Sequence, residues 1–93
     1  SLKNLSLSDD GNSVIVQGAI DLLCVERVEG RAVSAHVIDY KYTSLTQDSV
    51  IKKYTPQLAL YKNVVAKIYG LEESAVKCTI INIRACKQIE LEI

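Results

Sequence analysis

The stretch Val37-Ile38-Asp39-Tyr40-Lys41 decides how the rest of this sequence is interpreted. Its first two residues are β-branched and apolar, which favours a buried strand. An aspartate, a tyrosine and a lysine then follow without a turn residue. Side chains two positions apart on a strand point to the same face, so Asp39 and Lys41 are expected side by side. Because charged groups at the end of an apolar strand cost stability unless they are paired or used, this end is a candidate functional site.

The residues before this stretch predict an antiparallel hairpin. Residues 14–27 are rich in Val, Ile and Leu and predict a strand. Glu29-Gly30-Arg31 marks a turn, and a second strand is expected over residues 32–42. Asp21 on the first strand is therefore expected near Asp39 on the second.

The N-terminal part carries weaker signals. Residues 1–13 are polar, and Asp9-Asp10-Gly11-Asn12 supplies turn chemistry. Gly18 interrupts the first strand, which indicates a bulge or a close backbone approach.

The residues after the central stretch predict a helix. Thr55-Pro56 fits an N-cap followed by a first-turn proline, so we place the main helix at residues 56–69, ended by Gly70. A kinked helix over residues 47–69 is the alternative. One face of the helix is apolar and the other polar. The apolar positions are Leu58, Tyr61, Val65 and Ile68, and the positions expected mainly outside are Lys62, Asn63 and Lys67.

The tail predicts two more strands. Residues 76–84 form a mostly buried strand, and residues 87–93 alternate apolar and polar side chains, as in a half-exposed edge strand. Strand, strand, helix, strand and strand predict an α/β (α+β) fold, in which a helix packs on one face of a sheet.

Composition limits the class of protein. Ninety-three residues make one small domain, spanning residues 1–93, and the absence of methionine suggests a piece excised from a longer protein. Zero net charge gives no global attraction to nucleic acid. There is no long apolar run or signal-peptide pattern. Cys24, Cys78 and Cys86 lack metal-ligand spacing and are expected to be buried free thiols in a reducing compartment.

Asp21 and Asp39 are the candidates for metal binding. Two carboxylates converging from neighbouring strands form an oxygen-rich site suited to Mg²⁺ or Mn²⁺. Lys41 beside them can position a water or neutralise charge that develops on a phosphate. The alternative is a purely structural ion pair between Asp39 and Lys41.

Three ordered motifs resemble the PD-(D/E)xK nuclease superfamily. They are Gly18-x-x-Asp21, Ile38-Asp39-Tyr40-Lys41 and Gln57-x-x-x-Tyr61. The match is closest to the RecB-like nuclease domain at the C-terminus of AddA-type helicase–nucleases. It covers residues 14–69, and the tail matches only as generic strands. The resemblance implies a restriction-endonuclease-like core, incomplete at its N-terminus.

The resemblance also implies roles for individual residues. Asp21, Asp39 and the main-chain carbonyl of Tyr40 would bind the catalytic Mg²⁺ or Mn²⁺, with Lys41 as the catalytic lysine. Gln57 and Tyr61 would orient the site and contact DNA. Their spacing places both on one helix face. For Tyr61 core packing is the alternative, and for Gln57 an ordinary polar position near the helix start.

The sequence departs from the family pattern in two places. Family members carry an upstream helix with a metal-binding histidine, and nothing before Val14 matches it. His36 lies three positions before Asp39, so it is expected on the opposite face of the strand. Tyr42 stands where the family usually has threonine.

The resemblance implies a Mg-dependent DNA exonuclease domain of a bacterial, cytoplasmic helicase–nuclease that acts in double-strand break repair and recombination. Its expected partners are DNA, a helicase domain in the same parent chain and a second subunit, with no membrane. A catalytically inactive nuclease-fold module that binds DNA or partner subunits is the first alternative. A purely structural α/β domain is the second.

Overall fold

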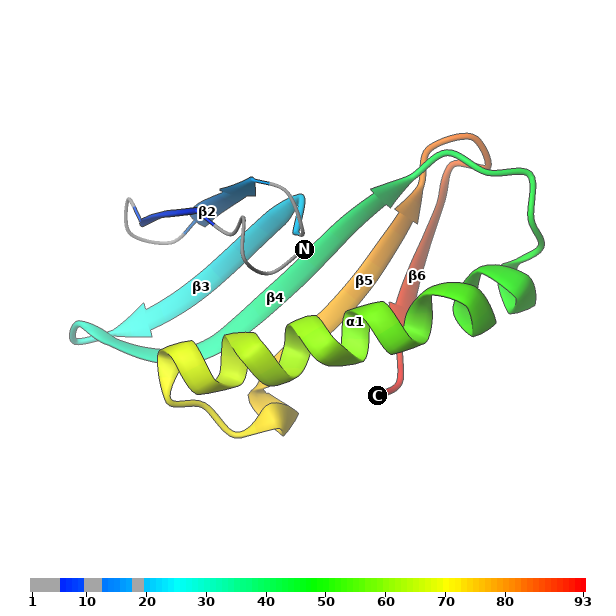
Figure 1. Ribbon diagram of the computed structural model, residues 1–93. Helices are drawn as coiled ribbons and strands as arrows, with labels where there is room; N and C mark the ends of the chain where they lie inside the picture. The colour runs from blue at the N-terminus through cyan, green and yellow to red at the C-terminus, as the bar shows by residue number, and fades with distance from the viewer. Residues whose placement is uncertain (1–5, 10–12, 18–19) are drawn as a thin grey trace.

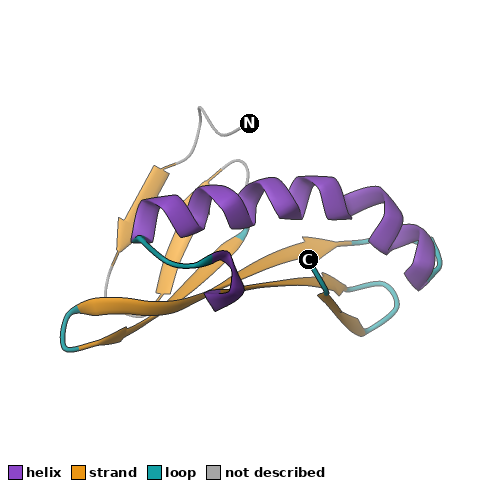
Figure 2. Ribbon diagram, turned by 90° about the horizontal axis from the view of Figure 1, so that it is seen from below, coloured by secondary structure: helices purple, strands orange, loops and turns teal. Residues whose placement is uncertain are grey.

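The computed structural model describes residues 6–9, 13–17 and 20–93. In chain order the elements are β1 (Ser6–Asp9), β2 (Ser13–Gln17), β3 (Leu22–Val28), β4 (Arg31–Lys41), α1 (Gln47–Tyr69), the 3-10 helix η2 (Glu73–Ala75), β5 (Val76–Asn82) and β6 (Lys87–Leu91). The strands form one sheet in the order β1-β2-β3-β4-β5-β6, and α1 lies across one face (Figures 1 and 2). The predicted α+β fold with a restriction-endonuclease-like core is confirmed.

The central hairpin joins β3 to β4 through a tight turn. Glu29 and Gly30 have φ angles of 51° and 79°, the left-handed conformation that two-residue hairpin turns need. The register places Leu22 opposite Ile38 and Val25 opposite Ala35. The predicted antiparallel hairpin is therefore confirmed.

The N-terminal strands differ from the prediction. The single strand predicted over residues 14–27 is two strands, β2 and β3. The polar segment that was expected to supply only a turn contains β1, which pairs antiparallel with β2. Backbone pairing needs no apolar side chain, so polar composition did not indicate it. Gly18, the expected bulge, lies outside the described residues.

Strands β4 and β5 are parallel neighbours, with Ala35 opposite Val76 and Lys41 opposite Asn82. Parallel strands need a long crossover connection, and α1 supplies it. The Asn82 side chain then fixes the exit of β4: its Oδ1 accepts from the Thr43 backbone N–H at 3.3 Å and its Nδ2 donates to the Thr43 carbonyl at 3.1 Å. This arrangement sets the direction in which the chain leaves Lys41.

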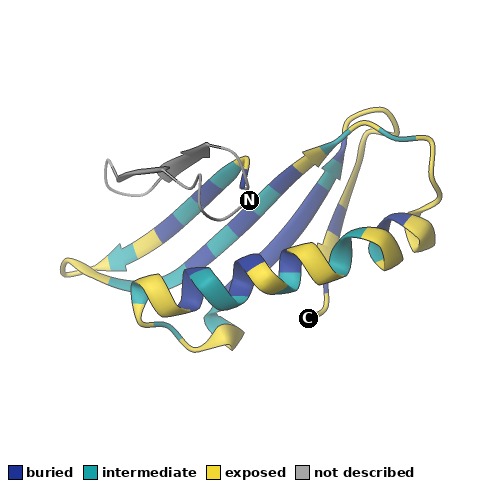
Figure 3. Cartoon of the chain, in the orientation of Figure 1, coloured by how far each residue is buried: buried dark blue, intermediate teal, exposed yellow. Residues whose placement is uncertain are grey.

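The core lies between α1 and the sheet face that the helix covers (Figure 3). The buried side chains alternate along β3, β4 and β6, as expected for a sheet covered on one face, whereas in the inner strand β5 Thr79 is buried on the other face as well. On the strands they include Leu23, Val25, Ala35, Val37, Val76, Cys78 and Ile80, and on the helix Val50, Leu58, Tyr61, Val65 and Ala66. The edge strand β6 keeps the predicted alternation, with Ile89 and Leu91 buried between exposed polar residues.

Helix α1 begins earlier than the main prediction placed it. Its N-cap is Thr46, whose side chain accepts from the Ser49 backbone N–H at 3.2 Å, and Gly70 ends it with a φ of 66°. The alternative, a kinked helix over residues 47–69, is therefore correct. Pro56 lies inside the helix, and the N-terminal turns bend away from the rest of the axis (Figure 2). The predicted cap, Thr55, has a buried hydroxyl without a hydrogen-bond partner among the described residues.

Two predictions on the helix surface are wrong. Ile68 was assigned to the apolar face, but it is 48% exposed because Val65, Ala66 and Tyr69 form the core-facing side of the last turns of α1. Lys62 was expected outside, but it is buried, and its ammonium donates to the Ile93 carbonyl. A lysine can place its methylene stem on apolar surface while its charged end finds an acceptor.

The three cysteines differ in exposure, although all are free thiols. Cys78 is buried in the core, and burial raises the pKa of its thiol to about 11. Cys24 is half-buried. Cys86 is exposed in the turn between β5 and β6, so the prediction that it is buried is wrong. Its apolar neighbours in the sequence bracket a turn rather than a buried strand.

A matched pair of substitutions tests where α1 begins. We expect Thr46→Ala to lower the free energy of unfolding by about 1 kcal/mol, because it removes the N-cap acceptor. Thr55→Val should be neutral or stabilising, because it removes a buried hydroxyl that has no partner. Urea denaturation followed by circular dichroism measures both. A larger loss for Thr55→Val than for Thr46→Ala would place the helix start at Pro56 instead.

Candidate functional site

Asp39 extends the buried row of β4 toward the carboxyl end of the strand. Ala35, Val37 and Asp39 alternate on the face covered by α1, and Asp39 is 4% exposed. The Lys41 Nζ lies 3.1 Å from the Asp39 Oδ2. This oxygen has no hydrogen-bond partner among the described residues. The buried carboxylate thus has an ion-pair neighbour but an unfilled hydrogen-bonding position.

Asp21 meets Asp39 from the neighbouring strand. It directly precedes β3, and the register that pairs Leu22 with Ile38 brings it next to the end of β4. The Asp21 Oδ2 accepts a hydrogen bond from the Tyr40 backbone N–H at 2.8 Å. Asp21 itself is exposed. One carboxylate is therefore open to solvent while its neighbour is buried, and the structure brings both together with Lys41 as expected.

Burial dominates the electrostatics of Asp39. It raises the pKa of this carboxyl from 3.8 to about 6, although the adjacent Lys41 ammonium acts to lower it. The neighbouring Asp21 carboxylate raises the pKa further. The lysine therefore compensates only part of the cost of desolvating the carboxylate.

Helix α1 contributes Tyr61 and Gln57 to the surroundings of the carboxylates. Tyr61 is 4% exposed, and burial followed by the charge of Asp39 raises the pKa of its hydroxyl. A side-chain hydrogen bond with Gln57 acts in the opposite direction. Gln57 is exposed. The two residues of the third sequence motif thus differ in exposure: Tyr61 is buried in the core, close enough for the Asp39 charge to act on it, and Gln57 is exposed.

Tyr54 is a further member of the site that the sequence prediction did not assign. Its ring centroid lies 4.5 Å from the Lys41 Nζ and 5.3 Å from the Lys53 Nζ. A signal for it existed: Tyr54 lies three residues before Gln57 and seven before Tyr61, which places the three on one helix face.

His36 lies on the opposite face of β4, as predicted. It is half-buried, and its Nε2 lies 2.6 Å from the Thr79 Oγ1. Burial, followed by the charge of Lys77, lowers the pKa of the imidazole. His36 is therefore separated by the sheet from Asp39 and Lys41.

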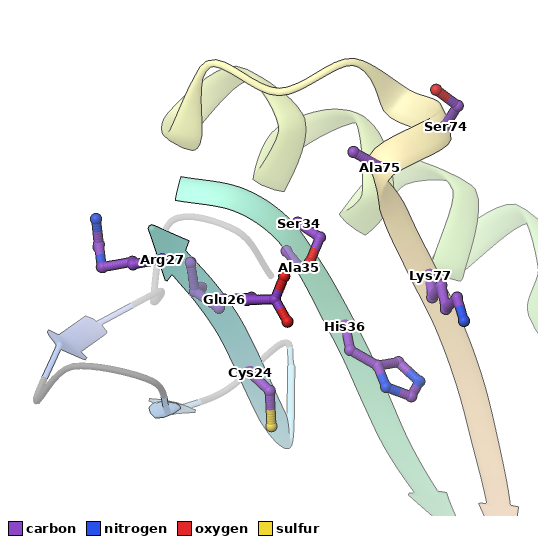
Figure 4. Close-up of a pocket in the computed structure, with 10 residues that line it drawn as sticks. Cys24, Glu26, Arg27, Ser34, Ala35, His36, Ser74, Ala75 and Lys77 are labelled. Atoms are coloured by element: carbon purple, nitrogen blue, oxygen red, sulfur yellow. The ribbon is translucent and has the colours of Figure 1, made fainter. Parts of the chain in front are cut away.

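A shallow hollow of about 590 Å³ surrounds His36 near η2 (Figure 4). Its lining includes Cys24, Glu26, Ser34 and Lys77. None of the residues around the Asp39 carboxylate belongs to this lining. The hollow and the carboxylate site are thus different places on the molecule.

The carboxylate pair fits a hard divalent cation. Oxygen is the donor that Mg²⁺ prefers, and Mg²⁺ often binds through one or two carboxylates while it keeps several waters. The Asp39 Oδ2, buried and without a hydrogen-bond partner, supplies an unfilled acceptor. Within residues 6–9, 13–17 and 20–93, no three His, Cys, Asp or Glu side chains gather into a metal-binding group. Asp21 and Asp39 are therefore the side chains that can supply oxygen ligands to a metal ion at this end of β4.

Removal of the Asp39 charge should stabilise the fold at neutral pH. The pKa of Asp39 is higher in the folded protein, so between about pH 4 and pH 6 the folded state holds the extra proton and stability falls as pH rises. Above about pH 7 the free-energy cost of burying the charge is complete, about 3 kcal/mol. We expect the free energy of unfolding of Asp39→Asn to exceed that of wild type by about this amount at pH 8. At pH 4 the two free energies should be almost equal.

Urea denaturation across this pH range provides the measurement. Glu26→Gln is the control, because Glu26 is an exposed strand glutamate. Its effect should be small and should not follow the same pH dependence. If Asp39→Asn is less stable than wild type at pH 8, the ion pair with Lys41 outweighs desolvation and the electrostatic account is wrong.

Comparison with known proteins adds one match. The family model described as PD-(D/E)XK nuclease superfamily matches residues 2–92, nearly the whole chain. No curated protein and no solved structure matches. In the described part of the chain, no helix has the length and apolar character needed to cross a membrane.

Proposed function

Because the chain belongs to the PD-(D/E)XK nuclease superfamily, we propose that it is a metal-dependent DNA nuclease domain that hydrolyses phosphodiester bonds. The observation that carries this proposal is the convergence of Asp21, Asp39 and Lys41 at the end of β4. The residues at the family's two acidic positions and its lysine position therefore lie close together, although Asp21 is far from the others in the sequence.

In this proposal Asp21, Asp39 and the main-chain carbonyl of Tyr40 hold Mg²⁺ or Mn²⁺. When bound, such an ion supplies Lewis-acid chemistry and lowers the pKa of a bound water. Asp39 is the buried donor, while the exposed Asp21 faces the side from which a substrate would approach. The hydrogen bond from the Tyr40 N–H holds Asp21 in place.

Lys41 is the proposed catalytic lysine. Its side chain is 24% exposed, so the ammonium can reach a phosphate outside while it stays beside Asp39. A cation at this position stabilises the negative charge that builds on the phosphate during attack by water. Gln57 and Tyr61 are the proposed helix residues that orient the site and contact DNA, and the exposure of Gln57 supports its part in this role.

The motif pattern also supports a more specific assignment. Asp39-Tyr40-Lys41 and Gln57-x-x-x-Tyr61 resemble the RecB-like nuclease domain of AddA-type helicase–nucleases. We propose on this basis an exonuclease role in double-strand break repair and recombination, in the cytoplasm of a bacterium. The partners proposed with it are DNA, a helicase domain of the same parent chain and a second subunit.

A nuclease-fold module that binds DNA or a partner without cutting is the second candidate. The observation in its favour is the Asp39–Lys41 contact of 3.1 Å, which gives each charge an opposite neighbour without any metal. Metal binding and cleavage separate the two candidates.

The first test is metal binding. Titration of Mn²⁺ into the chain, followed by calorimetry, should show one site whose affinity falls at least tenfold in Asp39→Asn, because the variant loses a charged oxygen donor. Asp48→Asn is the matched control, since Asp48 is an exposed aspartate in the first turn of α1. If a titration to millimolar Mn²⁺ gives the same affinity for wild type and Asp39→Asn, the assignment of Asp39 as a metal ligand is wrong.

The second test is cleavage of labelled DNA with Mg²⁺. We expect Lys41→Ala to lower kcat by about 10²–10³-fold, the usual effect of removing one group that stabilises transition-state charge. Lys67→Ala should leave kcat unchanged, because Lys67 is an exposed lysine in the last turn of α1. A Lys41→Ala variant that cleaves as fast as wild type would remove Lys41 from the mechanism.

A further inference from the structure

Lys41 has two neighbours that act on its charge. One is the Asp39 Oδ2, 3.1 Å from the Nζ, and the other is the ring of Tyr54, whose centroid lies 4.5 Å from the same atom. An ammonium within about 6 Å of an aromatic centroid is attracted by the negative charge on the ring face. The proposed catalytic lysine is thus held by a carboxylate on its own strand and by an aromatic ring on the helix.

The Tyr54 ring is a fixed support. It is half-buried and packs against the hydrophobic core, so it has few positions available. The lysine side chain, in contrast, has four rotatable bonds and loses considerable entropy when it is held in one conformation. A ring that is already ordered can therefore order the ammonium at low cost.

The two neighbours of Lys41 respond differently to a cation in the site. A divalent ion that binds Asp39 competes with Lys41 for the charge of the same carboxylate. The attraction of Lys41 to Asp39 then weakens, whereas its attraction to the Tyr54 ring does not depend on that carboxylate. The ring is therefore the neighbour that keeps the ammonium beside the end of β4 when a cation binds the carboxylate.

We infer that Tyr54 is a positioning residue, whose ring holds the Lys41 ammonium over the helix-covered end of β4. The part of this inference that concerns catalysis depends on the nuclease function proposed above. The part that concerns the position of Lys41 does not. Lys53, whose Nζ lies 5.3 Å from the same ring, adds a second positive charge on the solvent side of Tyr54.

The structure offers a matched control at the other end of α1. Tyr69 is also half-buried and packed against the core, and the Arg27 guanidinium lies 5.7 Å from its ring centroid. Tyr69→Leu and Tyr54→Leu remove the same side chain from the same helix and disturb a similar cation–aromatic contact. Of the two tyrosines, Tyr54 is the one beside Lys41. A loss of stability should therefore appear in both variants, whereas a loss of Lys41 positioning should appear in Tyr54→Leu alone.

The first measurement is the NMR shift of the Lys41 ε-methylene protons, with and without Mg²⁺. In wild type the ring current of Tyr54 should move these protons upfield of those of exposed lysines, and Mg²⁺ should not abolish the shift. Tyr54→Phe should retain it because the ring remains, Tyr54→Leu should lose it, and Tyr69→Leu should retain it. Retention of the shift in Tyr54→Leu would overturn the inference, whether or not the protein cleaves DNA.

The second measurement is Mg²⁺-dependent DNA cleavage by the same variants. Tyr54→Leu should lower kcat about tenfold with little change in KM, as expected for a cation–aromatic contact of ordinary strength, and Tyr54→Phe should restore the rate. Equal loss in Tyr69→Leu, or no rescue by phenylalanine, would overturn the catalytic part. A wild-type chain that does not cleave but shows the ring-current shift would reject the nuclease proposal and support the positioning of Lys41.

Discussion

Burial of one carboxylate is the constraint on which the rest of this site depends. Asp39 occupies a position in β4 that continues the row of Ala35 and Val37, so packing of α1 on the sheet removes Asp39 from water. The same packing forms the hydrophobic core, which means that the core cannot form without desolvating the charge. The Lys41 ammonium offsets part of this desolvation cost. The remainder is uncompensated, and it raises the pKa of Asp39.

The topology determines which residues surround that carboxylate. Because β4 and β5 are parallel, the chain must return along α1, and the helix begins just beyond the end of β4 (Figure 1). The part of α1 that carries Tyr54 and Tyr61 therefore lies near Asp39 and Lys41. The C-terminal half of α1 lies over the other end of the sheet, where Tyr69 meets Arg27.

The alternation along β4 and the turn at Glu29 and Gly30 could be predicted because both are local rules of strand geometry. The start of α1 could not be settled in this way. Thr46 and Thr55 are both suitable N-caps in the sequence, and only the packed helix shows that Thr46 makes the capping bond. The burial of Lys62 and the contact of Tyr54 with Lys41 depend on how the helix crosses the sheet, which no local pattern encodes.

The direction of the pKa shift bears on why the Asp39–Lys41 pair is present. An ion pair retained for stability lowers the pKa of its carboxyl, since the charged form gains more from its partner than it loses by burial. At Asp39 the balance is reversed, and replacement of a buried pair by apolar residues is often neutral or stabilising. A valine at position 39 would continue the β4 row without this cost. The Asp39 carboxylate therefore lowers the stability of the fold at neutral pH, and the neighbouring Asp21 raises the pKa of Asp39 further, a combination that favours a binding or catalytic role for the pair.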